Sequence, residues 1–359
     1  MAQIDQFLKV LFEQGGSDLH LTVGAPPIMR VHGHMQRLKF RDLSGKDMES
    51  LVYEIMDEEW RIRFLDTLDY DFAYEIPGMA RFRVNVFWQR KGLAAVMRTI
   101  PSDILTFDQL GLPDAVRKFC MLTKGLVLVT GPTGSGKSTT LAAMVDLINE
   151  ERQEHILTIE DPIEFTHPNK KCLVNQREIS THTKSLANAL RAALREDPDV
   201  ILVGEMRDRE TIELGITAAE TGHLVFGTLH TSSAPKTVDR IIGVFPSDQQ
   251  AQIRAMLAES LKGVIAQVLL KTKDGKGRRA ALEIMVGTPA INNLVRENKI
   301  HQIPSIIQTG KKDGMQQLDQ HILEFLMSGV ITAEEAYMKC NNKQAFRQYL
   351  DGSPSEELT

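Results

Sequence analysis

The chain has 359 residues, of which 42% are hydrophobic and 25% are charged, and its formal net charge at pH 7 is −5. These proportions are ordinary for a soluble globular protein of about two domains. The acidic balance excludes a global basic field that would attract nucleic acid. No run of roughly 18 or more apolar residues occurs, which excludes a membrane-spanning helix.

The first residues predict an amphipathic helix and not a signal peptide, because they lack a basic n-region and a small-residue cleavage site. Apolar side chains recur there at helical spacing, at Ile4, Phe7, Leu8, Leu11 and Phe12. The three cysteines lie far apart and form no C-x-x-C pair, so no zinc site and no disulfide framework are expected from Cys120, Cys172 and Cys340. These absences contribute to a predicted cytoplasmic location.

Residues 1–100 contain helical and strand patterns and are predicted to form a small α+β domain. We expect a short strand at Val31–His34, a helix at Asp47–Met56 and strands at Arg81–Trp88 and Gly92–Arg98. In the third of these, RFRVNVFW, apolar residues alternate strictly with polar ones, among them Arg81 and Arg83. Alternation of this kind places the apolar side chains on one face of a strand and the polar ones on the other.

Residues 101–113 are predicted to link this domain to a second one, which occupies residues 114–359. Short apolar runs predict strands at Leu126–Thr130, Ile156–Glu160, Val200–Gly204 and Leu224–Leu229. Amphipathic segments such as Ser185–Arg195 separate several of them, which is typical of an α/β sheet. From about residue 245 a helical region is expected, broken by the polar turn KTKDGKGRR at 271–279, and the tail DGSPSEELT is expected to be disordered.

Residues 131–138, GPTGSGKS, fill the pattern G-x-x-x-x-G-K-[ST] between a predicted strand and a predicted helix. This context predicts a phosphate-binding loop and argues against a glycine-rich turn that binds nothing. We expect Lys137 to reach the β- and γ-phosphates and Ser138 to hold Mg²⁺. The residues predicted to bind ATP are Gly131, Pro132, Thr133, Gly134, Ser135, Gly136, Lys137, Ser138 and Thr139.

Polar residues follow three further predicted strands, at the edge of the sheet where ligands bind. The first strand leads into residues 160–164, EDPIE, and the second ends at Glu205, with Gly204 where a Walker B strand usually carries aspartate. We therefore expect Glu205 to support the metal, through a water, and His230, after the third strand, to contact the γ-phosphate. His223 either takes part in the site or holds a loop, and the sequence leaves both roles open.

Four segments in order across residues 131–231, GPTGSGKS, TIEDPIEF, DPDVILVGEMRD and TAAETGHLVFGTLHT, resemble the Walker A, Asp, Walker B and His boxes of the secretion ATPase superfamily. Members of that superfamily drive type II and type IV secretion and type IV pili. The resemblance implies a PAS-like N-terminal domain, a RecA-like ATPase domain and a hexameric ring.

Two further segments resemble the pilus-retraction branch of the superfamily, GGSDLHLTVGAPPIMRVHG at 15–33 and AINNLVRENKIHQIPSIIQTG at 290–310. The second segment has Asn292 where the usual AIRNLIRE signature has arginine, and Val295 where it has isoleucine. These departures leave the role of this segment open, not the family. Pilus extension and type II secretion ATPases are longer and usually carry a tetracysteine zinc insert, which this chain does not have.

The resemblance also implies roles for individual residues. Glu164 corresponds to the catalytic glutamate of the Asp box and is expected to be the general base. Arg81 and Arg83 resemble the arginines that the N-terminal domain sends towards nucleotide, and Arg98 is a weaker third candidate. The same resemblance implies a partner, a platform protein of the inner membrane at the base of the pilus, on which the ring exerts force.

Three other functions remain open at this stage, besides an accessory retraction ATPase that shares the four boxes. A nucleic-acid motor predicts a basic channel with aromatic side chains, but aromatics are only 6% of the chain. A small-molecule kinase would need an acceptor pocket and a lid, and a monomer would be active. A non-hydrolysing regulatory paralogue is disfavoured by the intact Lys137, Glu164 and Glu205.

Overall fold

The computed structural model describes residues 2–31, 33–100, 104–275 and 277–350. The chain divides into two compact units, residues 1–103 together with Glu164–Thr166 and the remaining residues. Residues 101–103 of the expected linker and the tail expected to be disordered, 351–359, lie outside the described residues. In the part of the chain that the structure describes, no helix is long and apolar enough to cross a membrane.

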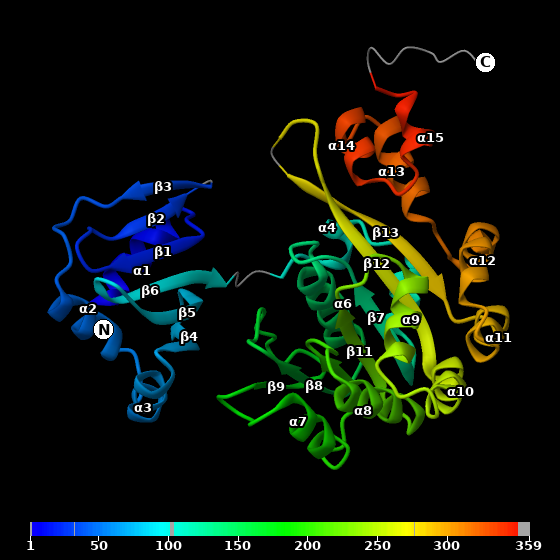
Figure 1. The fold of residues 1–359 in the computed structure, drawn as a ribbon, viewed down its shortest axis with the longest axis horizontal. Coiled ribbons are helices and arrows are strands. Elements are labelled where there is room, and N and C mark those ends of the chain that lie inside the picture. The colour runs from blue at the N-terminus through cyan, green and yellow to red at the C-terminus, as the bar shows by residue number, and fades with distance from the viewer. Residues whose placement is uncertain (1, 32, 101–103, 276, 351–359) are drawn as a thin grey trace. The chain divides into compact units, whose positions relative to one another are not determined.

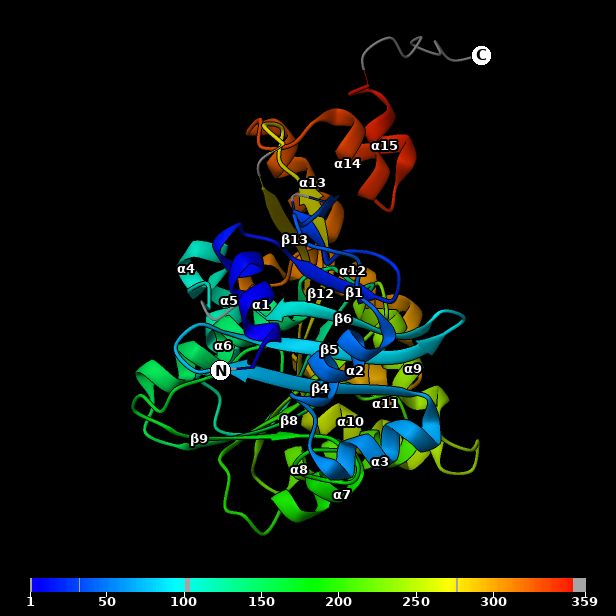
Figure 2. The same ribbon diagram turned by 90° about the vertical axis from the view of Figure 1, so that its left-hand side faces the viewer.

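The first unit is built on an antiparallel sheet, which over the described residues has six strands in the order β3-β2-β1-β6-β5-β4 (Figure 2). Its elements are α1 (Ile4–Glu13), β1 (Asp18–Thr22), β2 (Ile28–Val31), β3 (His34–Arg37), α2 (Gly45–Tyr53), α3 (Glu58–Thr67), β4 (Asp69–Ile76), β5 (Ala80–Gln89) and β6 (Gly92–Ile100). The predicted α+β character of this domain is confirmed.

The predicted alternation along β5 is confirmed, because Phe82, Val84 and Val86 are fully buried in the core of the first unit. The N-terminal helix is also present as predicted, and its residues Ile4 and Leu8 are fully buried. Its apolar stripe is wider than the buried face, however, since Phe12 remains 43% exposed.

The short strand predicted around Gly33 is wrong, because this glycine lies at the turn of a hairpin. Strand β2 ends at Val31 and the antiparallel strand β3 begins at His34. Gly33 has φ +85°, a left-handed conformation that only glycine adopts at little cost. Gly33 therefore separates two strands and does not lie inside one.

The second unit surrounds a mixed sheet, which over the described residues has seven strands in the order β13-β12-β7-β11-β10-β8-β9 (Figure 1). The strands are β7 (Gly125–Thr130), β8 (His155–Glu160), β9 (Leu173–Glu178), β10 (Val200–Val203), β11 (Leu224–Leu229), β12 (Leu261–Lys271) and β13 (Arg278–Val286). The helices are α4 (Phe107–Leu110), α5 (Asp114–Cys120), α6 (Lys137–Glu151), α7 (Leu186–Ala193), α8 (Arg209–Glu220), α9 (Ala234–Gly243), α10 (Gln250–Ser260), α11 (Pro289–Arg296), α12 (Ile303–Thr309), α13 (Leu318–Met327), α14 (Ala333–Lys339) and α15 (Lys343–Arg347), with 3₁₀ turns at Ile300–Gln302 and Gly310–Asp313.

Helices cover both faces of this sheet, which explains why its central strands are continuous apolar runs. Every residue of β7 and β11 is buried. Leu126 and Leu128 face a cluster built by α7–α11, whereas Val127 and Val129 face one built by α4–α6. Parallel strands with two covered faces read as unbroken Val, Ile and Leu segments, and the four strands predicted here are confirmed.

The helical region predicted from residue 245 is interrupted by a long β-hairpin, so this part of the prediction is wrong for residues 261–286. Strand β12 pairs in parallel with β7, and β13 pairs antiparallel with β12. The predicted polar turn KTKDGKGRR spans the end of β12 and the start of β13. Figure 1 shows the hairpin extending beyond the other strands towards α13–α15. Helices resume after the hairpin, as predicted.

Residues 104–113, which the sequence indicated as the second part of a linker, contain the short helix α4. Thr106 caps it, because its hydroxyl accepts a hydrogen bond from the backbone N–H of Gln109 and the Gln109 side chain accepts one from Thr106. Phe107 and Leu112 are buried in the cluster that contains α5 and α6. These contacts fix the segment to the second unit.

Candidate nucleotide-binding site

The loop between β7 and α6 has the backbone conformation of a phosphate cradle. Gly131, Gly134 and Gly136 have φ values of +144°, +77° and +87°. A Cβ atom on Gly131 would lie 2.3 Å from the carbonyl oxygen of Gln267, so a larger residue does not fit there. The loop ends at the N-terminus of α6, and backbone N–H groups at such a turn attract anions.

The side chains of this loop also fit an ATP phosphate tail with its metal. Lys137 Nζ donates to the carbonyl oxygens of Gly131 (3.0 Å) and Pro132 (3.3 Å), so the ammonium lies over the loop. Ser135 is only 3% exposed, and its hydroxyl has no hydrogen-bond partner in the described part of the chain. Ser138 and Thr139 lie half-buried in the first turn of α6. A hydroxyl oxygen such as that of Ser138 is a type of ligand that Mg²⁺ binds in proteins.

Gln267 of β12 holds the phosphate loop by hydrogen bonds, a role that the sequence did not predict. Its Nε2 donates to the carbonyl oxygen of Ser135 (2.6 Å) and its Oε1 accepts from the hydroxyl of Thr140 (2.9 Å). The side chain is 1% exposed and joins the loop to the first turns of α6. A glutamine within an apolar segment could have indicated a buried polar contact. Its partners lie more than 120 residues away in sequence, so the sequence pattern does not identify them.

Glu205 and His230 follow the neighbouring strands β10 and β11. The structure brings these two predicted site residues into contact. His230 Nε2 lies 2.9 Å from Glu205 Oε1. Arg207 Nη2 donates to Glu205 Oε2 at 2.6 Å, a contact that was not predicted. Burial would raise the pKa of Glu205, but the hydrogen bonds and charges of Arg207 and His230 outweigh it and hold that pKa below its ordinary value.

Gly204, at the place of the usual Walker B aspartate, leaves little room for a side chain. A Cβ atom there would lie 3.2 Å from both Glu160 Cα and the carbonyl oxygen of Ile159. Both atoms belong to β8, the parallel neighbour of β10. A side chain at this position would need the neighbouring backbone of β8 to shift slightly. The first carboxylate after β10 is that of Glu205.

The acidic residues after β8 have different surroundings. Glu160 accepts a hydrogen bond from the hydroxyl of Thr158 (2.7 Å) and another from Gln176 (3.3 Å). Asp161 and Glu164 are exposed in the loop that connects β8 to β9. Glu164, the predicted base, therefore has a solvent-exposed side chain.

The candidate arginines lie on strands of the first unit. Arg83 pairs with Asp71 at 3.4 Å, and both side chains are about half exposed. Arg98 donates to the buried Asp18 at 2.9 Å, which gives this weaker candidate a structural role inside its own unit. Arg81 lies on β5 opposite Glu75 of β4.

His223 holds a loop, which resolves the alternative that the sequence left open. It precedes β11 and thus lies at the opposite edge of the sheet from the phosphate loop. Its Nδ1 and its backbone N–H both bond to the carbonyl oxygen of Ala218, at 3.0 and 3.2 Å. These bonds close the turn after α8.

Helix α11 carries residues 290–296 of the second segment and is amphipathic. Ile291 and Val295 are fully buried, whereas Asn293 and Arg296 are exposed. Arg296 Nη1 donates to Asn293 Oδ1 at 3.0 Å, along the exposed face of the helix. The residues of this polar face are far from the phosphate loop in sequence, and their side chains are exposed to solvent.

Comparisons with known proteins agree with this geometry. A family model described as type II/IV secretion system protein matches residues 4–338. The type IV pilus retraction ATPase PilT of Pseudomonas aeruginosa is 55% identical over 96% of this chain and 99% of its own length. The type IV pilus ATPase PilU of the same organism is 38% identical over 99% of this chain and 93% of its own.

A crystal structure of the pilus retraction motor PilT with bound ADP superposes with a TM-score of 0.90 at 47% identity, covering 96% of this chain and 98% of the other. The match includes both units, so the predicted order of an N-terminal α+β domain and a P-loop α/β domain is confirmed. The chain therefore belongs to the family of type II/IV secretion system proteins.

Proposed function

We propose that this chain is a motor ATPase that hydrolyses ATP to power retraction of type IV pili, and hence twitching motility. The observation that carries the proposal is its 55% identity to the retraction ATPase PilT over nearly the whole of both chains. The phosphate loop and the Glu205–His230 pair supply the chemistry. The PilT structure with bound ADP supports a nucleotide as the ligand.

The proposed reaction is in-line attack of water on the γ-phosphate, which breaks its bond to the bridging oxygen and releases ADP and phosphate. Glu164 accepts the proton of the attacking water. Lys137 and the loop N–H groups hold the phosphates, and His230 contacts the γ-phosphate. Ser138 would hold Mg²⁺ and Glu205 would support its water shell; the ion neutralises charge on the phosphates.

The proposed assembly is a homo-hexamer in the cytoplasm, held at the inner membrane by a platform protein at the pilus base. Arg81 and Arg83 of the N-terminal domain contribute positive charge to nucleotide sites of the ring. Between the two domains lies the segment that the sequence assigned to a linker, residues 101–113, and a hinge there would convert nucleotide state into displacement, with residues 104–113 moving as part of the second unit.

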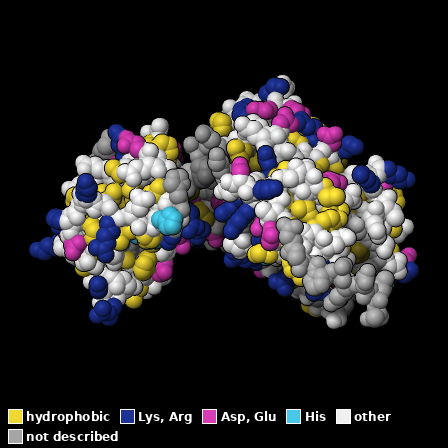
Figure 3. Space-filling model, turned by 90° about the horizontal axis from the view of Figure 1, so that it is seen from above, with side chains coloured by type: hydrophobic (Ala, Val, Ile, Leu, Met, Phe, Trp, Pro, Cys, Tyr) yellow, Lys and Arg dark blue, Asp and Glu magenta, His cyan; other side chains and the backbone are white. Residues whose placement is uncertain are grey.

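An accessory retraction ATPase of the PilU type is the second candidate, but identity to PilU is 38% against 55% to PilT. A nucleic-acid motor is disfavoured by the surface. On the face of the second unit seen in Figure 3, Lys and Arg side chains are interspersed with Asp and Glu side chains and form no continuous basic stripe. A small-molecule kinase would remain active as a monomer, so ATPase rate against protein concentration, with native mass, separates it from a ring.

The experiment that tests the mechanism is Glu164→Gln, which keeps the shape of the side chain and removes its basicity. The variant is expected to bind Mg-ATP normally and to hydrolyse it roughly 10²–10⁴-fold more slowly, the usual contribution of a general base. Asp161→Asn, in the same exposed loop, is the matched control. Normal turnover by Glu164→Gln with an inactive Asp161→Asn would show that the base is misassigned.

A further inference from the structure

Residues 161–172 connect β8 to β9 and carry the proposed base, Glu164, on a segment without helix or strand. A catalytic group on an irregular loop needs support, because misplacement by about 1 Å costs on the order of 10²-fold in rate. In this chain, buried and half-buried side chains bond to the loop backbone on both sides of Glu164.

The first anchors come from β9, where Gln176 and Glu178 share one face because side chains alternate along a strand. Glu178 is 2% exposed, and its Oε2 accepts from the backbone N–H of Ile163 at 3.1 Å. Gln176 Oε1 accepts from the backbone N–H of His167 at 2.8 Å. Its Nε2 donates to the Glu160 carboxylate (3.3 Å), so this one side chain contacts residues before and after Glu164.

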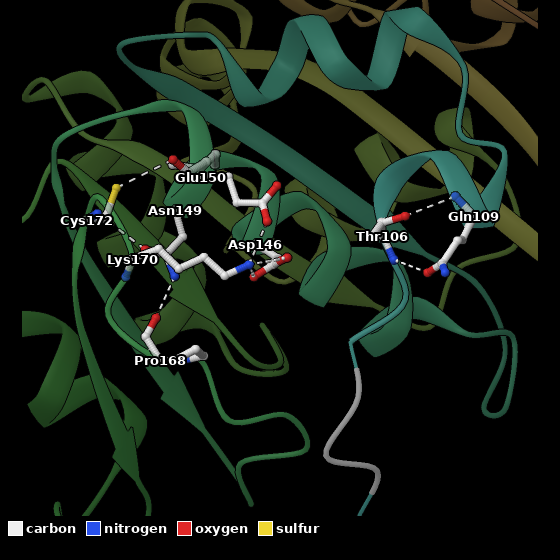
Figure 4. Close-up of polar contacts among 9 residues, drawn as sticks. Thr106, Gln109, Asp146, Asn149, Glu150, Pro168, Lys170 and Cys172 are labelled. Carbon is white, nitrogen blue, oxygen red and sulfur yellow. Dashed lines mark hydrogen bonds and ion pairs between the residues drawn. The ribbon is translucent and has the colours of Figure 1, made fainter.

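The second anchor comes from α6, the helix that begins in the phosphate loop (Figure 4). Asn149 has no exposed surface, and its Nδ2 donates to the carbonyl oxygen of Pro168 at 2.7 Å. Its Oδ1 accepts from the backbone N–H of Lys170 at 3.1 Å. The Lys170 ammonium in turn contacts Asp146 and Glu150 of the same helix, at 2.7 and 2.8 Å.

We propose that Gln176, Glu178 and Asn149 are positioning residues that fix the 161–172 loop to β9 and α6 and thereby place Glu164 for proton transfer. The inference rests on the proposed function, in which Glu164 is the base. The competing explanation is that these bonds only satisfy backbone groups and stabilise the fold. The two explanations differ in what happens to turnover when Glu164 is itself replaced.

The test uses Gln176→Leu in the full-length assembled protein. We expect kcat to fall roughly 10–100-fold, as for a displaced catalytic group, while the affinity for a fluorescent ATP analogue is unchanged. Asn175→Leu is the matched control, because Asn175 is exposed on the opposite face of the same strand and bonds to His155 at 3.3 Å. This control is expected to keep normal kcat.

The deciding measurement is the double variant Gln176→Leu with Glu164→Gln. Misplacing a base that is already absent costs nothing further, so the double variant should hydrolyse ATP as slowly as Glu164→Gln alone. An equal fold-loss in both backgrounds, or a lower melting temperature with normal kcat, would overturn the inference. Normal turnover by Glu164→Gln alone would instead overturn the proposed base, and the inference with it.

If Gln176→Leu fails to fold, Asn149→Ala provides the same cycle. It removes the bonds to Pro168 and Lys170 and places no charge in the buried site. We expect a smaller loss of kcat than for Gln176→Leu, again absent when Glu164 is already glutamine. A loss of the same size in both backgrounds would contradict the positioning role.

Discussion

Glu205 lies between two nitrogen donors, Arg207 at 2.6 Å and His230 at 2.9 Å. The arrangement keeps its carboxylate ionised in a partly buried site, which suits a group that supports a metal shell. His230 follows from the box pattern, whereas Arg207 does not, because nothing in the string GEMRD shows that its side chain turns back to the glutamate.

Removing Arg207 is predicted to change the pH dependence of hydrolysis. Arg207 helps to lower the pKa of Glu205, so the carboxylate stays ionised to lower pH, and activity that needs it is lost as pH falls through that pKa. Arg207→Ala should raise this pKa and move the acidic limb of the kcat/KM profile to higher pH. Arg209→Ala, an exposed arginine that lies 3.9 Å from Glu213, is the control. An unmoved acidic limb would contradict the assigned role of Arg207.

Lys137 offers the phosphates a positive charge that no neighbour in the loop replaces. Lys137→Ala is predicted to abolish hydrolysis and weaken ATP binding while circular dichroism and melting temperature stay close to those of the parent protein. The exposed Lys124, just before β7, gives the control Lys124→Ala with normal turnover. Near-normal hydrolysis by Lys137→Ala would remove the assignment of the phosphate loop.

At the scale of elements, the hairpin β12–β13 supports the site from one side. Gln267 of β12 bonds to the phosphate loop, and Glu283 of β13 accepts from the backbone N–H of Ala234 (2.7 Å), at the start of the helix after His230. Burial raises the pKa of Glu283. The hairpin therefore contacts both the Walker A loop and the helix that follows the His box.

Gln267→Leu is predicted to weaken ATP binding, because it leaves the Ser135 carbonyl and the Thr140 hydroxyl without their buried partner. Unsatisfied buried groups of this kind cost roughly 1–3 kcal/mol each. Thr140→Val is the graded control, since it removes one bond and leaves the one to Ser135. The measurements are the ATP affinity and the denaturant midpoint of each variant. Equal ATP affinities for both variants and the parent would show that the Gln267 hydrogen bonds do not shape the phosphate loop.

The sequence predicted the boxes correctly because each is a local strand–turn pattern with its polar residues at the strand end. The sequence did not predict strand β12, because residues 263–267 of that strand are all buried, and apolar and polar side chains do not alternate along them. An apolar run of that length has no periodicity that separates strand from helix. Gln176, Glu178 and Gln267 escaped for another reason, since their roles depend on loops that only the folded sheet brings to them.

At the scale of the whole molecule, we propose that the polar face of α11 meets a neighbouring subunit or the pilus machinery. Arg296→Ala is predicted to leave native mass and ATPase rate unchanged and to abolish twitching, because Arg296 is exposed and remote in sequence from the boxes. Lys299→Ala, an exposed cation just beyond the helix, is the control. Joint loss of ATPase activity and twitching, with a lower melting temperature, would favour a purely structural role.

The central claim is that this ATPase retracts pili. The most direct measurement deletes the gene in its source bacterium and counts surface pili beside twitching zones, with the parent gene and its Glu164→Gln variant restored separately. The account predicts that pili remain on the surface, that twitching is lost, and that only the parent gene restores it. Loss of the surface pili, or normal twitching without the protein, would contradict it.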